Sequence, residues 1–170
     1  EARAALRARL GVIAGELAIA ALPAILEGAS HPVPQDESLV TYARRLNRAD
    51  APLDFRQPAA VLGQRVLALE GWPGSTFEHR GVTIKVGVAR GEDSAPSGTP
   101  GQVLSADRAG VRVACGQGEL VLLQLQRPGG KMLPAGEFLT GFPLAVGEIL
   151  ASAEMPAFVA TAPFPRTPKA

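Results

Sequence analysis

Apolar residues recur at helical spacing in the first part of the chain, residues 3–27. The steps of three and four are kept by Leu6, Leu10, Ile13, Leu17, Ala20 and Ala24. This pattern predicts an amphipathic helix with a wide apolar face, interrupted or bent at Pro23 and ending at Gly28. We expect such a face to dock on a larger body, because a lone helix has no partner for it.

The next stretch, residues 29–55, has no regular period and is predicted to be an interdomain linker, called here the strap. Residues 31–34 read His-Pro-Val-Pro and must be extended, because a residue that precedes proline is pushed out of the helical region. A short basic segment follows, in which Tyr42 precedes Arg44, Arg45 and Arg48. This segment is either a solvated connector or a segment that contacts an anionic partner.

A second helical pattern covers residues 56–70. Pro58 suits its first turn, and the predicted apolar face consists of Val61, Leu62, Val66 and Leu69. Gly-Trp-Pro-Gly at 71–74 ends it. We expect Trp72 to pack into the body of the domain at this corner.

Beyond the corner the period changes to two, which is typical of strands. The predicted strands are Val82–Ala89, Gln102–Ala106, Gly110–Ala114, Leu120–Leu125 and Phe142–Ile149. The glycines at 116 and 118 suit a tight hairpin. Residues 91–101 are predicted to form a flexible loop, and residues 134–141 are predicted to form one helical turn. Short strands with glycine turns and a capping helix favour a mainly β fold, a small, closed or nearly closed OB-like barrel.

These patterns divide the chain into four parts. Residues 1–28 form a terminal helix, 29–55 the linker, 56–152 the barrel domain, and 153–170 a proline-rich tail that we expect to be flexible.

Composition narrows the class of protein. Apolar residues make up 46% of the 170, enough for a real core. The longest apolar run, around Ala18–Ile25, is far shorter than the roughly 20 residues that span a bilayer, so we expect no membrane partner and see no signal peptide. The chain lacks an initiator Met, which we interpret as a start inside a longer protein.

Cysteine and histidine contents exclude two kinds of site. The single cysteine, Cys115, excludes an internal disulfide, fits a reducing compartment and is expected to be buried. Only two histidines, His31 and His79, are present, so a Cys/His zinc site is not expected. His79 is expected on the surface at a hairpin turn. These features predict a cytoplasmic protein without a metal.

The net charge of +1 hides a basic middle. Residues 44–131 carry twelve Lys and Arg against eight Asp and Glu, a balance of +4. This bias is mild for a nucleic-acid-binding domain, although it suits contacts with phosphates.

Several segments, in order, resemble the C-terminal half of the methionyl-tRNA formyltransferase family. They are HPVPQDESLVTYARRLNRADAPLDF, RVLALEGWPGSTF, GVTIKV, VACGQGELVLLQLQRPGGKML and AGEFLTGF. The resemblance covers almost all of residues 3–150, and its specificity comes from the order of the segments. Two departures are Gly71, where the family often has proline, and the Arg44–Arg45 pair, where a lysine is common.

The resemblance implies an enzyme that transfers a formyl group from 10-formyltetrahydrofolate to methionyl initiator tRNA in translation initiation. The family's catalytic residues and folate pocket lie in an N-terminal α/β domain, of which residues 3–27 would be the last helix. The resemblance therefore implies no catalytic residue and no cofactor in this chain, and it implies two partners: initiator methionyl-tRNA and the chain's own catalytic domain.

Candidate tRNA-binding residues follow from charge and position. They are Arg44, Arg45 and Arg48 in the strap, Lys85 in a predicted strand, and Arg127 and Lys131 around the turn at 128–130. Arginine offers a planar fork that pairs with phosphate oxygens. Three alternatives stay open: the strap arginines could pair with Asp50 and Asp54 while Tyr42 packs on the barrel, Lys85 could be an ordinary outward-facing strand lysine, and Trp72 could stack on a nucleotide.

Two other functions are compatible with the pattern. One is the same C-terminal domain in a formyltransferase that acts on a sugar nucleotide or on folate. The other is a non-enzymatic OB-type module for single-stranded nucleic acid. The absence of aromatic residues between Gly81 and Met132 counts against that module, which needs aromatic platforms.

Overall fold

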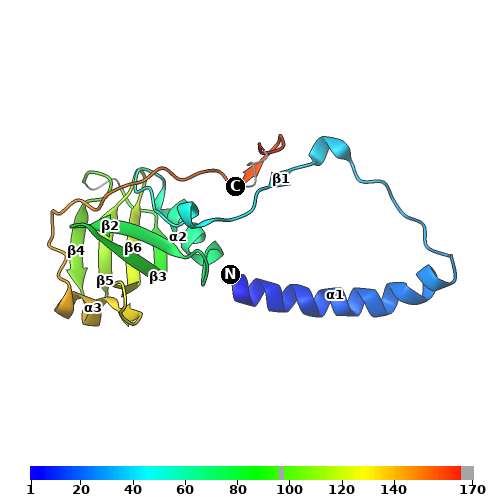
Figure 1. Ribbon diagram of the computed structural model, residues 1–170, viewed down its shortest axis with the longest axis horizontal. Helices are drawn as coiled ribbons and strands as arrows, with labels where there is room; N and C mark the ends of the chain where they lie inside the picture. Colours follow the sequence, from blue (N-terminus) through cyan, green and yellow to red (C-terminus); the bar gives the residue numbers. More distant parts are fainter. Residues whose placement is uncertain (96–97, 166–170) are drawn as a thin grey trace. The chain divides into compact units, whose positions relative to one another are not determined.

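The computed structural model describes residues 1–95 and 98–165, and it divides the chain into two compact units (Figure 1). Asn47–Pro156 forms the larger unit, called here the barrel unit. Glu1–Leu46 and the segment that begins at Ala157 form the other. The two units are described separately.

A six-stranded antiparallel sheet is the framework of the barrel unit. Its strands are β2 (Ser75–His79), β3 (Val82–Glu92), β4 (Val103–Asp107), β5 (Gly110–Ala114), β6 (Glu119–Gln126) and β7 (Leu133–Pro134). The strand order is β2-β3-β6-β5-β4, and β7 pairs with β6. Four of these strands were predicted within a few residues, including the β5–β6 hairpin at 116–118. The strands β2 and β7 were not predicted.

The two edge strands are connected by the segment 147–151. Single bridges join Ile149 to Gln102, next to β4, and Ala151 to Glu78 in β2. The strand predicted at 142–149 is wrong: Pro143 lacks a backbone donor, Gly147 has a φ of +90°, and the chain crosses between the edges with one bridge at each. The OB-like, mainly β fold is confirmed, and these bridges complete it.

Two helices cover parts of the sheet, α2 (Ala59–Ala68) and α3 (Ala135–Gly141). α2 packs mainly against β3, and α3 packs against β4, β5 and β6 (Figure 1). A Cβ added to Gly63 of α2 would lie 2.8 Å from the backbone nitrogen of Gly91, so the two backbones meet directly. Val61, predicted on the buried face, is half-exposed; Gly63 takes its place against the sheet.

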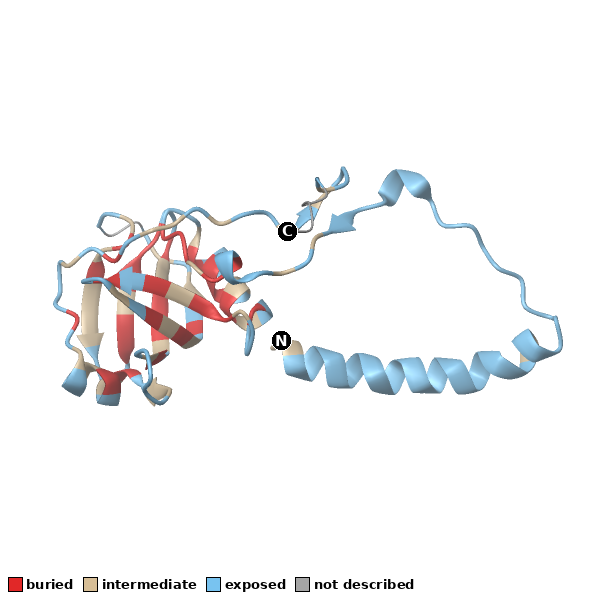
Figure 2. Cartoon of the chain, in the orientation of Figure 1, coloured by how far each residue is buried: buried red, intermediate tan, exposed pale blue. Residues whose placement is uncertain are grey.

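The hydrophobic core lies inside the barrel unit, where Figure 2 shows the buried residues gathered. Its fully buried side chains include Leu53, Phe55, Leu62, Ile84, Val103, Leu120, Leu122, Leu125 and Leu150. Leu53 and Phe55 belong to the stretch predicted as linker, and they pack as part of this unit. Because these two side chains are buried, the end of the strap is fixed on the barrel unit.

Two side chains near β2 differ from expectation. His79 is buried, because β2 is a strand and not the start of a turn, and its inward positions are Ser75, Phe77 and His79. Trp72 is 50% exposed and does not pack into the core. Cys115 is buried, as predicted.

The other unit contains α1 (Arg3–Leu26), the short 3-10 helix η1 (Glu37–Leu39), and the strands β1 (Tyr42–Ala43) and β8 (Val159–Ala160). The predicted first helix is confirmed, with Gly28 just beyond its end at a φ of +70°. None of its residues is buried (Figure 2). Apolar side chains lie on all sides of it, so its face is broader than the predicted stripe.

The whole of α1 differs from its longest apolar run in what it indicates about a membrane. By length and composition α1 could cross a bilayer, because an 18-residue window has a mean hydropathy of 1.8. The prediction of no membrane span rested on the longest apolar run, and Glu16 interrupts the apolar residues of this helix. Core helices of soluble proteins and signal sequences share this length and hydropathy.

β1 and β8 form a two-stranded antiparallel ribbon between the strap and the segment predicted as a flexible tail. Tyr42 pairs with Ala160, and Ala43 with Val159. Tyr42 therefore lies in a strand pairing, with its side chain 38% exposed.

Candidate nucleic-acid interface

The outward positions of β2 and β3 form a polar face on the barrel unit. Strand alternation buries Phe77 and Ile84 and turns their neighbours outward. Thr76 pairs with Lys85 across the two strands, and Glu78 pairs with Thr83, whose hydroxyl donates to the Glu78 carboxylate. Directly opposed residues lie on the same side of a sheet, so all four side chains share one face.

A hollow lies beside this face, next to Trp72 at the corner between α2 and β2. It has a volume of about 430 Å³. This hollow is called here the Trp72 hollow. It is lined by Arg48, Ala51, Pro52, Trp72, Pro73, Thr76, Glu78 and Thr83. The bridge between Pro52 and Thr76 holds the end of the strap against β2, which explains how Arg48 comes to lie near Trp72.

Lys85 borders the same corner. Its Nζ donates to the carbonyl of Gly71 at 3.5 Å, and its aliphatic part covers Gly74, where an added Cβ would lie 2.6 Å from the lysine Cε. Lys85 is half-buried and faces outward, as its strand position indicated. It is held against the glycine turn rather than extending freely into solvent.

The turn after β6 adds two cations next to Lys85. Gln126 pairs with Lys85 across β3 and β6, and its side-chain amide donates to the carbonyl of Gly130 at 2.7 Å. Arg127 donates to the carbonyl of Gly141 at 3.2 Å, which anchors its guanidinium near the end of α3. Lys131 is exposed. The pairing of Gln126 with Lys85 thus brings this turn and Lys85 together, as one basic region of the barrel unit.

Arg44 and Arg45 belong to the other unit. Arg44 donates through Nε to the carbonyl of Ala157 at 2.8 Å, and its guanidinium lies 5.3 Å from the centroid of the Phe158 ring. These contacts fasten the strap to the chain segment around β8. The guanidinium of Arg45 is exposed.

Both carboxylates proposed as alternative partners of the strap arginines make local contacts. Asp54 pairs with Arg56 at 2.7 Å, and this hydrogen bond lowers the pKa of Asp54. The Asp50 carboxylate accepts from the backbone nitrogen of Asn47 at 2.7 Å in a capping box, which begins a short 3-10 helix at Arg48–Asp50.

Several other cations are paired inside the barrel unit. Arg112 lies 2.7 Å from Glu92 and 2.9 Å from Glu119, and with Arg90 it lowers the pKa of Glu92. Arg80 pairs with Glu148. Within residues 1–95 and 98–165, by contrast, the side chains of Arg48 and Lys131 have no hydrogen bond or ion pair, so both charges are available to a ligand.

Glu148 also connects to the buried histidine. Its Oε2 lies 3.1 Å from Nε2 of His79 and accepts from the backbone nitrogen of Ala145 at 3.0 Å. The backbone hydrogen bond is the main cause of the lowered pKa of Glu148, and Arg80 adds to it. This cluster fastens the closing segment to β2.

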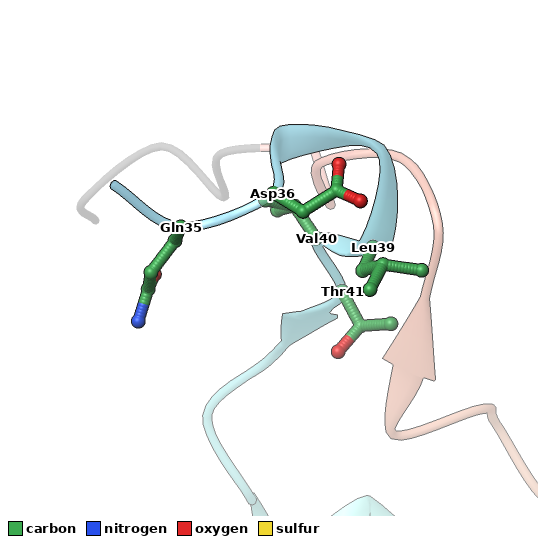
Figure 3. Close-up of a pocket in the computed structure, with 5 residues that line it drawn as sticks. All are labelled: Gln35, Asp36, Leu39, Val40 and Thr41. Atoms are coloured by element: carbon green, nitrogen blue, oxygen red, sulfur yellow. The ribbon is translucent and has the colours of Figure 1, made fainter. Parts of the chain in front are cut away.

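A second hollow, of about 440 Å³, lies in the predicted linker and is unsuited to specific binding. Its lining comes from one short stretch, Gln35–Thr41, whose labelled side chains do not converge on a common point (Figure 3). Asp36 is occupied with Ser38, whose backbone and hydroxyl donate to it at 2.9 and 2.7 Å.

Metal and nucleophile chemistry find no support in the part of the chain that the structure describes. No group of three or more His, Cys, Asp or Glu side chains there is arranged to hold a metal ion. Burial raises the pKa of the Cys115 thiol to about 11, so it is protonated at neutral pH. The site is suited to binding, through cations, hydrogen-bonding groups and one aromatic ring.

Comparison with known families decides the assignment. Residues 45–143 match the sequence model of the formyl transferase C-terminal domain. The chain belongs to this family. The matched range starts within the strap and contains the Trp72 hollow, Lys85 and the turn at 127–131.

Relatives named methionyl-tRNA formyltransferase share this formyl transferase C-terminal domain. The chain is 44% identical to the protein from Burkholderia thailandensis over 71% of its own length and 37% of the relative's. It is 47% identical to that of Paraburkholderia phytofirmans over 68% of the chain and 35% of the relative. With the protein from Acidovorax ebreus, identity is 41% over 88% of the chain and 47% of the relative. The chain thus spans less than half of these proteins.

Solved structures share the fold at low identity. HypX from Aquifex aeolicus matches with a TM-score of 0.55 and 23% identity, over 78% of this chain and 24% of that one. The same protein in complex with tetrahydrofolic acid matches with a TM-score of 0.51 and 22% identity, over 82% and 26% of the two chains. These likenesses support the fold of the barrel unit.

Proposed function

We propose that this chain is the C-terminal, tRNA-binding portion of a methionyl-tRNA formyltransferase. The full-length enzyme would transfer a formyl group from 10-formyltetrahydrofolate to the amino group of methionyl initiator tRNA. The observation that carries the proposal is the 41–47% identity to proteins of that name over 68–88% of the chain. The sugar-nucleotide and folate alternatives have no comparable support.

The cations of the barrel unit supply a physical role for this portion. Arg48, Lys85, Arg127 and Lys131 present cations on the barrel unit, and such groups contact phosphates without reading sequence. Arg44 and Arg45 would add charges from the strap. The chemistry itself would belong to an N-terminal catalytic domain, which would also hold the folate cofactor, and a cytoplasmic location is part of the same proposal.

Phe77 argues against a stand-alone OB-type module. Its ring is 2% exposed and packs edge-on against Phe55, so it offers no stacking surface. Trp72 is then the one aromatic candidate from the corner through Met132, fewer than such modules use.

The test is formyl transfer by the full-length protein that carries this chain. We expect formylmethionine on initiator tRNA with 10-formyltetrahydrofolate as donor, and no turnover by the 170-residue chain alone. Transfer to a sugar nucleotide, or activity of the isolated chain, would contradict the proposal. A control reaction with uncharged tRNA excludes formylation at other groups.

A further inference from the structure

We propose that the Trp72 hollow binds one unpaired nucleotide of RNA. In this arrangement the base stacks on Trp72, the phosphate pairs with Arg48, and Glu78 accepts a hydrogen bond from an amino group of the base. The inference rests on the proposed function, because it refines how this domain meets its RNA.

The aromatic ring is the first argument. Trp72 is 50% exposed, although tryptophan is usually largely buried, and it borders a hollow rather than the core. An exposed indole next to polar groups provides a stacking platform for any base, because every base has a π-face. The proline that follows, Pro73, lines the same hollow and extends its apolar wall.

The charges around the ring match the other parts of a nucleotide. Arg48 lines the hollow, and its guanidinium has no ion pair or hydrogen bond among the described residues, so it is free to pair with a phosphate. The Glu78 carboxylate takes the hydroxyl of Thr83 and keeps lone pairs for a further donor. A base amino group supplies such a donor, whereas a phosphate would be repelled from this side.

The size and surroundings also fit. The hollow, about 430 Å³, is within the roughly 300–1,000 Å³ of small-molecule sites. Thr76 lines the hollow, and Lys85 is its cross-strand partner. On the other side Lys85 pairs with Gln126, which the turn at 127–131 follows. A strand of RNA that leaves the hollow in this direction meets further cations, so a single nucleotide here is continuous with a longer backbone contact.

The experiment uses Trp72 itself, the only tryptophan of the chain, as the reporter. The 170-residue chain is titrated with single-stranded oligoadenylate, with an abasic oligonucleotide of the same number of phosphates, and with duplex RNA. We expect quenching of tryptophan fluorescence by oligoadenylate only. Oligoadenylate binding without quenching would overturn the proposal.

Variants separate stacking from general attraction. With a labelled oligoadenylate, Trp72→Ala should weaken binding at least about fivefold and Trp72→Phe should retain most of it, as expected for base–aromatic stacking. Arg48→Gln should reduce the salt slope by about one unit. The matched control is Arg90→Gln, an exposed arginine paired with Glu92 and not in the hollow, which should bind like the parent. Equal binding by Trp72→Ala, Trp72→Phe and the parent chain would overturn the proposal.

A formylation assay of the full-length protein distinguishes this inference from the proposed function. Formylation of initiator tRNA without oligoadenylate quenching would reject the nucleotide site alone. Quenching without formylation of any charged tRNA would reject the enzyme assignment and leave the site in place.

Discussion

At the scale of single residues, the most informative departures from sequence-based expectation lie around β2. The burial of His79 and Trp72 is the reverse of what was expected: the histidine is buried and the tryptophan is half-exposed. The sequence did not reveal this because β2 follows a glycine-proline corner and reads Ser-Thr-Phe-Glu-His, with polar residues at two of its inward positions. Only the pairing with β3 fixes which side chains face inward. A polar strand next to a sharp corner is therefore poorly predicted from periodicity, and here it carries the candidate site.

Glu148 is expected to stabilise the fold in a pH-dependent way. Its pKa is lowered in the folded state, so its contribution is present above the pKa of an unperturbed carboxyl, about 4.3, and is lost as the pH falls through the lower folded value. Glu148→Gln should therefore lower the melting temperature at pH 7, and its difference from the parent chain should shrink at acid pH. Thermal denaturation from pH 7 to pH 3 measures this.

The control for that measurement is Glu137→Gln on α3, whose carboxylate is outside the cluster. A constant difference between Glu148→Gln and the parent chain at every pH would contradict the argument, because it would leave no role for ionisation.

At the scale of elements, close backbone contact explains how α2 packs on the sheet. Gly63 and Gly91 meet without side chains between them, and Gly91 also lies against the backbone of Ala59. Helical periodicity predicted α2 but assigned Val61 to its buried face, because hydrophobicity counts cannot show that a glycine is the contact residue. Composition was also misleading for residues 142–149. They have a strand-like composition, but they cross between the edge strands and do not form a strand.

Gly91→Ala should destabilise the barrel unit, because the new methyl group would overlap the carbonyl of Ala59. Overpacking of this kind costs about 1–3 kcal/mol. Urea denaturation followed by circular dichroism should show a lower midpoint. Gly11→Ala is the matched control: nothing lies within 4 Å of its added Cβ, so the barrel midpoint should not fall. Unchanged stability of Gly91→Ala would mean that α2 and β3 separate easily.

α1 is predicted to open far more readily than the barrel strands when the chain is alone. None of its residues is buried, whereas β3, β5 and β6 form the core of the sheet. Amide hydrogen exchange should show fast exchange in Arg3–Leu26 and slow exchange in β6. Addition of phospholipid vesicles is a second arm: protection of α1 only with vesicles would favour a membrane role over docking on a catalytic domain. Protection of α1 equal to that of β6 in a monomer, without vesicles, would contradict the prediction.

At the scale of the whole molecule, ordered resemblance was more informative than any single physical pattern. The mild +4 balance of residues 44–131 and one exposed aromatic would not have indicated an RNA partner on their own. The order of the strap, the corner, the strands and the basic turn indicated the family, and the match over residues 45–143 confirms it. The structure separates the cations paired with Glu92, Glu119 and Glu148 from the others, a distinction that the sequence does not make.

The last prediction concerns how these charges act together in the full-length protein. If Arg45 and Lys131 contact phosphates, replacing either by alanine should weaken binding of initiator and non-initiator tRNA alike. Each replacement should reduce the slope of log K against log salt by about one unit, because each phosphate contact releases bound counterions. Arg112→Ala is the control, since that arginine is already paired with Glu92 and Glu119. Its salt slope should equal that of the parent. An unchanged slope in Arg45→Ala and Lys131→Ala would mean that the basic middle is solvated surface, and that the strap is only a connector.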